Sequence, residues 1–306
     1  MTELIDVLDA CDLAIARAEG LLDEPLLADL ERRAASARQR NGFLGEALVV
    51  AFAGGTGCGK SSILNALVGS EAVPTGIVRP TTQSATAVHA HRDFTDLSPL
   101  IDAIGISSTI IEAGAGDIVF VDLPDFDSTE EAHRHVVENV LPMVDAVIWV
   151  LDPEKYADPV LHRGFLERLA PYEDQFVFVL NQVDRLGDHL GDVVENLEGL
   201  LRADGFATPS VVSTVAIPVG DLPPHVDALS MAIAQRLDAK ATAIGKIAVD
   251  MRATARDGFA GCRAVDRRNM GEQSRDRVAL AAASFVWLGV MSYELHDRVA
   301  IDEGRP

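Results

Sequence analysis

The sequence is short of cysteine and of positive charge, and each shortage excludes a class of protein. Its 306 residues include three cysteines, Cys11, Cys58 and Cys262, which are too few and too scattered for a disulfide framework or a zinc site. This scarcity favours a reducing compartment. Because 26 basic residues face 47 acidic ones, the formal charge is −21, which repels phosphate backbones, and we expect no nucleic-acid partner.

The N-terminus also lacks the features of a secretory signal. The first 13 residues, MTELIDVLDACDL, have no basic region, and acidic residues interrupt their apolar positions. We therefore expect no signal peptide and a cytoplasmic protein. With 48% hydrophobic residues and a mean hydropathy of +0.16, the chain can bury a large core, which excludes global disorder.

Charge is unevenly distributed along the chain. Residues 239–306 carry 11 basic and 9 acidic side chains, whereas residues 1–238 carry 15 and 38. Lysine occurs at four positions only, beside 22 arginines: Lys60, Lys155, Lys240 and Lys246. A sequence that avoids lysine so consistently draws attention to the few positions where lysine is kept.

Short apolar runs alternate with helical patterns in the middle of the chain, which predicts an α/β fold with a doubly wound, mostly parallel sheet. The runs predicted as strands are Ala47–Ala53, Ile118–Val121, Ala146–Leu151, Phe176–Leu180 and Val211–Val215. The patterns predicted as helices between them are Ser61–Val68, Glu130–Leu141, Val160–Leu169 and Gly191–Leu201. In such a fold, ligands bind at the carboxyl ends of the strands.

Helical patterns flank this α/β region on both sides. We expect two helices in residues 1–43, with a break near Asp23-Glu24-Pro25, and helix throughout residues 238–300. The predicted organisation is N-terminal helices at 1–43, an α/β domain at 44–238, and a helical region at 239–306 that packs with the N-terminal helices.

A phosphate-binding loop follows the first predicted strand. The segment Gly54-Gly55-Thr56-Gly57-Cys58-Gly59-Lys60-Ser61 satisfies the pattern G-x-x-x-x-G-K-[ST]. Its glycines let backbone N–H groups surround phosphates, and the helix that begins near Lys60 adds its positive dipole end. Lys60 can reach the β- and γ-phosphates, and the Ser61 hydroxyl, followed by Ser62, can ligate Mg²⁺. The segment therefore predicts a nucleotide site, in which Cys58 is a small filler.

Polar residues at the ends of later strands complete the predicted site. Asp122 ends a strand where a carboxylate can hold Mg²⁺ through water. The segment Asn181-Gln182-Val183-Asp184 stands at the end of another predicted strand. A carboxylate there accepts hydrogen bonds from the N1–H and 2-amino groups of guanine, which adenine cannot supply. Ser213 and Thr214 end the fifth strand, where a backbone N–H can meet the guanine carbonyl. A hydroxyl in Arg79-Pro80-Thr81-Thr82 can complete the Mg²⁺ shell.

Together these motifs resemble the bacterial Era/dynamin-like group of P-loop GTPases. GGTGCGKSSILNALVG resembles the loop and first helix of that group, VRPTT its switch I, and DLPD its switch II. The segments VDAVIWVLDPEKYADPVLHRGFLERL and VLNQVDRL are also similar to that group. The resemblance covers about residues 46–238, and the flanks match only as helical additions.

The resemblance implies a role for individual residues and implies GTP or GDP and Mg²⁺ as cofactors. Gly54, Gly59, Lys60 and Ser61 hold the phosphates and Mg²⁺, and Asp122 holds Mg²⁺ through water. Thr82, with Thr81 as the alternative, senses the γ-phosphate and, with Lys60, serves catalysis. Asn181 and Asp184 select guanine.

Two departures from the family pattern predict slow hydrolysis. Asp125 stands where the family has the switch II glycine, and no glutamine follows it to position water; Phe126 and Asp127 do. Gln182 replaces the lysine of the guanine motif and loses a stem along the base and a tie to the phosphate loop. Glutamine keeps part of the reach of lysine, so we expect weaker nucleotide binding that is still directed to guanine. A partner or a second copy, bound through the GTPase or the helical region, can supply the missing catalytic group.

The most apolar segment, Val278–Tyr293, has two interpretations. Its 16 residues span about 24 Å as a helix, short of a hydrocarbon core of about 30 Å. One interpretation is a buried helix packed against the N-terminal pair. The other is peripheral contact of residues 263–293 with the inner face of the cell membrane, helped by an upstream basic flank: Arg263, Arg267, Arg268, Arg275 and Arg277.

Three functions follow in order of preference. The first is a slow GTP-hydrolysing switch in cell-envelope or membrane-linked processes. The second is a GTP-binding interaction module with little or no hydrolysis, and the third is an Era-like ribosome- or RNA-associated GTPase. The eight histidines, among them His89, show no metal-ligand pattern, and we expect them at the surface.

Overall fold

The computed structural model describes residues 4–40, 47–75, 84–90, 97–124, 135–218, 222–268 and 270–302. The chain divides into two compact units. A sheet unit comprises residues 47–235, and a helical unit combines residues 1–46 with residues 236–306.

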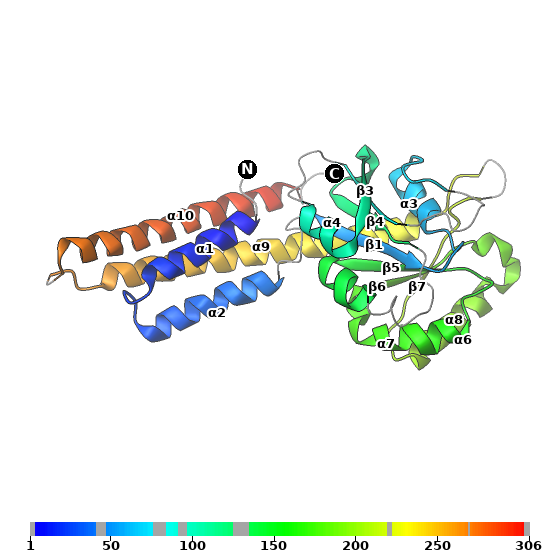
Figure 1. The fold of residues 1–306 in the computed structure, drawn as a ribbon, viewed down its shortest axis with the longest axis horizontal. Helices are drawn as coiled ribbons and strands as arrows, with labels where there is room; N and C mark the ends of the chain where they lie inside the picture. Colours follow the sequence, from blue (N-terminus) through cyan, green and yellow to red (C-terminus); the bar gives the residue numbers. More distant parts are fainter. Residues whose placement is uncertain are drawn as a thin grey trace. The chain divides into compact units, whose positions relative to one another are not determined.

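The described residues of the sheet unit form one seven-stranded sheet in the order β3-β2-β4-β1-β5-β6-β7 (Figure 1). Neighbouring strands pair in parallel, except that β2 runs antiparallel to β4. The predicted α/β class with a mostly parallel sheet is confirmed. The strands are β1 (Leu48–Gly54), β2 (Ala85–His89), β3 (Ile106–Ile111), β4 (Ile118–Asp122), β5 (Ala146–Leu151), β6 (Phe176–Leu180) and β7 (Val211–Ser213).

The register of the parallel strands brings the predicted functional segments to one edge of the sheet. Phe52 of β1 pairs with Asp122, and Gly54 pairs with Val150 of β5. Leu151 pairs with Leu180, and Leu180 pairs with Ser213. The carboxyl ends of β1, β4, β5, β6 and β7 therefore lie together, where an open α/β sheet binds ligands.

Two strands, β2 and β3, carry no clear signal in the sequence. The run ATAVH of β2 is rich in alanine, and β3 exposes most of its residues at the edge of the sheet. His89, at the end of β2, is buried, and so is His162, so the expectation that these histidines lie at the surface is wrong.

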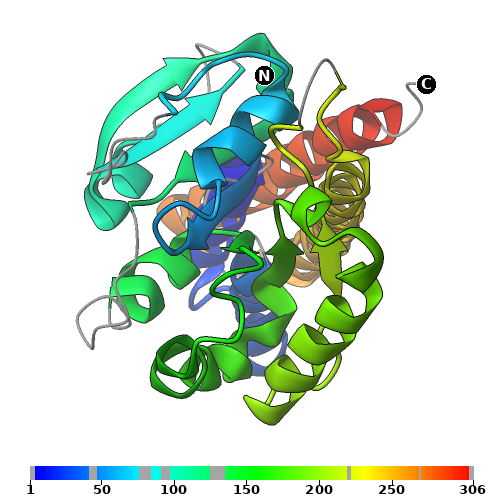
Figure 2. The same cartoon turned by 90° about the vertical axis from the view of Figure 1, so that its right-hand side faces the viewer.

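Helices flank the sheet (Figure 2). Those in this unit are α3 (Lys60–Val68), α4 (Ser98–Ile104), α6 (Pro159–Leu161), α7 (Glu167–Leu169) and α8 (Leu190–Ala203). Shorter 3₁₀ or π turns occupy Ala113–Ala115, Val136–Val140, Leu141–Met143, His162–Leu166, Ala170–Gln175, Val183–Arg185 and Gly187–His189. The single helix expected over 160–169 is thus α6 and α7 joined by a π turn, and the one expected over 130–141 is described only from residue 135 onward.

The helical unit is built from α1 (Leu4–Ala18), α2 (Glu24–Arg40), α10 (Glu272–Asp302) and most of α9 (Asp227–Ala264). Their long axes run side by side (Figure 1). A shared apolar core contains Leu8, Leu30, Met251 and Phe285, all 0–1% exposed. The helix expected throughout 238–300 is interrupted after Ala264, and α9 begins eleven residues before that stretch.

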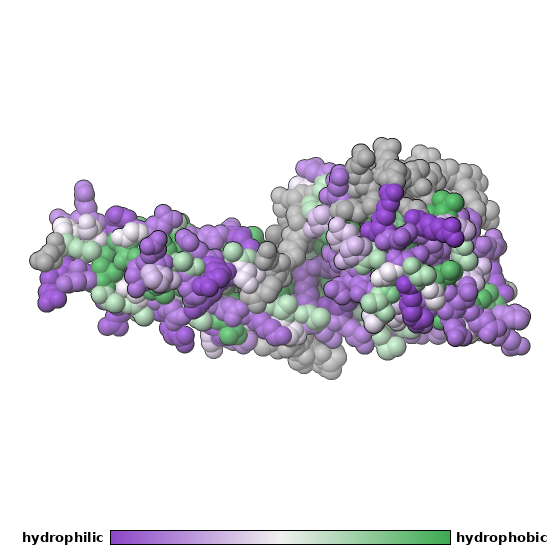
Figure 3. Space-filling view, turned by 90° about the horizontal axis from the view of Figure 1, so that it is seen from below, coloured by the Kyte–Doolittle hydropathy of each residue, from purple (hydrophilic) through white to green (hydrophobic). Residues whose placement is uncertain are grey.

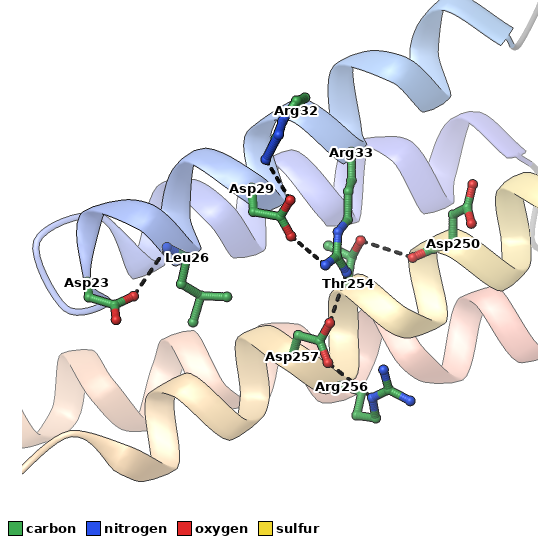
Figure 4. Close-up of polar contacts among 9 residues, drawn as sticks. All are labelled: Asp23, Leu26, Asp29, Arg32, Arg33, Asp250, Thr254, Arg256 and Asp257. Carbon is green, nitrogen blue, oxygen red and sulfur yellow. Dashed lines mark hydrogen bonds and ion pairs between the residues drawn. The ribbon is translucent and has the colours of Figure 1, made fainter.

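Ion pairs join helices of this unit that are far apart in sequence (Figure 4). Arg33 of α2 pairs with Asp29 on its own helix, and its Nη1 lies 2.9 Å from the Asp257 carboxylate of α9. Burial tends to raise the pKa of Asp257, but hydrogen bonds from Arg33 and Arg256 outweigh it and lower the pKa. The carboxylate therefore stays charged at neutral pH and remains paired with Arg33 across α2 and α9.

The apolar segment of α10 is buried on one face and exposed on the other. Val278, Phe285 and Leu288 are fully buried, whereas Leu280, Val286, Trp287, Val290 and Tyr293 are 44–60% exposed. By length and composition, Glu272–Asp297 is long and apolar enough to cross a membrane, and 44% of its most apolar window is buried within the protein. Figure 3 shows hydrophobic residues reaching the surface of the helical unit.

Candidate nucleotide-binding site

The phosphate loop joins β1 to α3 and adopts backbone angles that favour glycine. Gly54, Gly57 and Gly59 have φ of 143°, 81° and 98°. Left-handed values of this kind cost little in glycine and strain residues that carry a Cβ atom. Gly59 precedes the first residue of α3, so the loop delivers its backbone N–H groups to the positive end of a helix.

Close packing requires glycine at two of these positions. A Cβ atom on Gly59 would overlap the side-chain amide of Asn181. One on Gly54 would overlap the carbonyl oxygen of Val150 on β5 and lie 3.1 Å from Cys58 Sγ. Cys58 is buried at 2% exposure, as expected of a small filler beneath the loop.

Lys60, Ser61 and Asp122 gather at the start of α3. Lys60 Nζ donates to the Gly54 carbonyl at 3.0 Å. Ser61 Oγ donates to Asp122 Oδ2 at 2.6 Å, and Asp122 is 1% exposed. A hydroxyl and a buried carboxylate in contact at a helix N-terminus are hard oxygen ligands of the kind Mg²⁺ prefers, so these residues fit the predicted ion. Ser62 follows in the first turn and is half-buried.

Asn181 connects three parts of the site. Its Nδ2 donates to the Cys58 carbonyl of the loop at 2.9 Å. Its Oδ1 accepts from Thr214 Oγ1 at 3.1 Å and from the Ala216 backbone N–H at 3.2 Å. Asn181 and Thr214 are buried, so this side chain ties the phosphate loop to the segment after β7, where Ser213 ends the strand.

Gln182 contacts the phosphate loop, so the tie expected to be lost with the lysine is present, made by the part of the reach that glutamine was expected to keep. Gln182 Nε2 donates to the Gly57 carbonyl at 3.1 Å. Among the described residues other than glycine, Gln182 alone has a positive φ, at 62°, and this turn carries its side chain back to the loop. Asp184, two residues on, is exposed at the same edge, where a base can reach it.

Two segments of the sequence-based prediction lie outside the described part of the chain. One contains Thr81 and Thr82 and the other contains Asp125 and the two residues after it, so switch I and the switch II substitution stay predictions. The loop residues Gly55 and Thr56 are described and half-buried.

One contact of the loop was missed from the sequence. Lys155, in the segment after β5, donates from Nζ to the Thr56 carbonyl at 3.2 Å across 99 positions of sequence. The scarcity of lysine was the only signal that could have identified it.

Comparisons with known proteins agree on the class of this domain. Residues 49–182 match the family model described as 50S ribosome-binding GTPase. The tRNA modification GTPase MnmE of Actinobacillus succinogenes is 30% identical over 190 residues, which cover 60% of this chain and 37% of that protein. The same protein of Sodalis glossinidius is 32% identical with the same coverage. The match thus spans less than two fifths of these relatives.

Solved structures with a similar course of the chain include two bacterial proteins. One belongs to an oligomerised bacterial dynamin pair described as sensing and tethering membranes, with a TM-score of 0.49 and 13% identity over 90% of this chain and 57% of that one. The other is the bacterial selenocysteine-specific elongation factor EF-Sec, with a TM-score of 0.41 and 17% identity over 63% and 29%.

Proposed function

Residues 49–182 form a P-loop GTPase domain, and from this premise we propose that the protein is a slow GTP hydrolase that acts as a nucleotide-dependent switch. Members of this family hydrolyse GTP. The observation that carries the proposal is the pair Ser61–Asp122 at the start of α3, because it is a ligand set that suits Mg²⁺. Lys60, the preceding residue, contacts the Gly54 carbonyl of the phosphate loop. When bound, Mg²⁺ would offset the charge that develops on the phosphates.

In the proposed mechanism, each residue of the site has its own role. Lys60 exchanges the Gly54 carbonyl for the phosphates of GTP, and the N–H groups of the loop bind the same oxygens. Asp184 accepts from the guanine edge, while Asn181 holds the loop and the segment after β7 in place. The rate is low because Asp125 and the missing glutamine leave water poorly positioned, unless a second copy supplies the group.

A turnover assay tests this function and separates it from GTP binding without hydrolysis. Phosphate release from GTP and from ATP is measured for the wild type and for Lys60→Ala over a range of protein concentrations. We expect GTP turnover above that of the variant, no ATP turnover, and a specific rate that rises with concentration if copies activate each other. GTP turnover no higher than that of Lys60→Ala would leave the interaction module as the function.

A membrane-linked role is supported by the exposed apolar face of α10. Trp287 and Tyr293 are 60% and 57% exposed, and arginines lie upstream of the face. Aromatic side chains beside basic ones suit the interface of an anionic membrane. On this proposal, the protein works in the cytoplasm at the inner face of the membrane. The name of the MnmE relatives suggests an RNA-associated role. This role is disfavoured because residues 1–238 carry 38 acidic and 15 basic side chains, and the excess negative charge repels RNA phosphates.

Vesicle co-sedimentation tests the membrane contact without removing the buried face of α10. We expect the wild type to pellet with vesicles containing one part phosphatidylglycerol to two parts phosphatidylcholine, and Val286→Ser/Trp287→Ser to stay in solution, because the substitutions remove exposed apolar area. Ile217→Ser, at a 69% exposed position of the sheet unit, serves as the control. Equal sedimentation of the wild type and the double variant would refute the contact.

A further inference from the structure

The carbonyl groups of the phosphate loop are held by side chains from three different parts of the sheet unit. Each of four loop carbonyls accepts a hydrogen bond from a side-chain nitrogen. The pairs are Gly54 with Lys60, Thr56 with Lys155, Gly57 with Gln182, and Cys58 with Asn181. Because the C=O and N–H of a peptide unit point in opposite directions, restraining the carbonyls also sets the directions of the N–H groups that bind an anion.

Lys155 lies in the segment VDAVIWVLDPEKYADPVLHRGFLERL, which resembles the GTPase group but whose individual residues received no predicted role. The part of this segment at 152–156 begins directly after β5 with Asp152, which is 7% exposed. Asp152 Oδ1 accepts from the backbone N–H groups of Glu154 at 2.9 Å and Lys155 at 3.1 Å, and its carbonyl accepts from the Tyr156 N–H. This turn sets the backbone of Lys155 before its side chain contacts the loop.

A buried histidine anchors the other end of the segment. His162 Nε2 lies 2.7 Å from the Tyr156 carbonyl, and because a carbonyl only accepts, the ring nitrogen donates. His162 Nδ1 lies 2.5 Å from Asp204 Oδ2 at the end of α8, and both side chains are buried. The segment 152–156 is therefore fastened to β5 at one end and to α8 at the other.

We propose that Lys155 is a positioning residue of the nucleotide site, which holds the Thr56 carbonyl and supplies a positive charge to the rim of the phosphate loop. The charge matters because Gln182, its neighbour on the loop, is neutral. A cation beside the loop attracts an anionic nucleotide, and its contribution is screened by salt because the lysine is exposed. The proposal rests on nucleotide binding by this loop.

Two measurements on the full chain test Lys155, and one of them requires no nucleotide. Lys155→Met removes the charge and keeps the length, Lys155→Arg keeps the charge, and Lys246→Met changes an exposed lysine of the helical unit. We expect faster hydrogen exchange over residues 54–60 of nucleotide-free Lys155→Met only. We also expect GDP to bind this variant about three- to tenfold more weakly at low salt, with the difference shrinking at 0.5 M salt.

The outcomes separate this proposal from the proposed function. Unchanged exchange and unchanged GDP affinity in Lys155→Met would overturn the role of Lys155 while GDP binding by the wild type stands. Equal losses in Lys155→Met and Lys155→Arg would also overturn it, because the charge would then be irrelevant. A wild type that binds no GDP contradicts the proposed function, and the exchange data still decide whether Lys155 restrains the loop.

Discussion

Gly59→Ala is expected to weaken GDP binding by about 100-fold or more. Gly59 has φ of 98°, and a non-glycine residue in such a conformation costs about 1–3 kcal/mol. Its Cβ atom would also overlap the Asn181 amide, which is buried and cannot withdraw without losing its hydrogen bond to Cys58. The loop moves to relieve about 3 kcal/mol of strain, and GDP binding must restore the strained conformation. This cost corresponds to roughly a 100-fold loss of affinity for GDP.

Calorimetry with GDP measures this effect, and thermal unfolding shows whether the variant is folded. Gly199→Ala is the matched control, because Gly199 lies in α8 with open space at its Cβ position. We expect this control to bind GDP normally and to gain up to about 1 kcal/mol of stability from better helix propensity. Gly59→Ala with wild-type affinity would show that the loop tolerates a Cβ atom, against the geometry described above.

Asn181→Ala is expected to abolish GDP binding and to lower the free energy of unfolding of the sheet unit by about 3 kcal/mol. The substitution leaves three buried groups without this partner: the Cys58 carbonyl, the Thr214 hydroxyl and the Ala216 N–H. A buried polar group that loses its hydrogen bond costs about 1–3 kcal/mol. The phosphate loop also loses its link to the segment after β7.

Urea unfolding followed by tryptophan fluorescence isolates this effect. Trp149 is buried in β5 and Trp287 is exposed in the helical unit, so a Trp287→Phe background leaves a probe of the sheet unit alone. Asn196→Ala, an exposed asparagine of α8 that accepts from the Tyr156 hydroxyl at 3.2 Å, is the control, with a change below about 1 kcal/mol. An equally small change for Asn181→Ala would contradict the linking role.

The sequence correctly predicted the fold class because its central strands are strongly apolar and alternate with helical patterns. Strand β5, with all six residues buried, is an example. It did not predict β2 and β3, because β3 lies at the sheet edge with an exposed, polar face and β2 is rich in alanine, which is not typical of a strand. Nor did it predict the interruption of the expected helix over 160–169 by a π turn at His162–Leu166.

The amphipathic role of α10 also required the structure. The composition of residues 278–293 fits either a buried helix or a surface-contacting one. Packing against α1 and α9 buries Phe285 and Leu288, and it leaves Trp287 and Val290 exposed on the same turns. The interpretation as a buried helix therefore holds for one face of α10, and membrane contact stays a proposal for the exposed face.

By itself, the sequence determined which residues are candidates for the nucleotide site. The loop Gly54–Ser61, Asp122 and the Asn181–Asp184 segment could be identified because each is a short contiguous motif whose residue types follow from the groups they bind. Only the tertiary structure decided how that loop is held. Lys155, Gln182 and Asn181 reach consecutive loop carbonyls from 99, 125 and 123 positions away, and contacts so distant depend on strand register and helix packing, which no local pattern encodes.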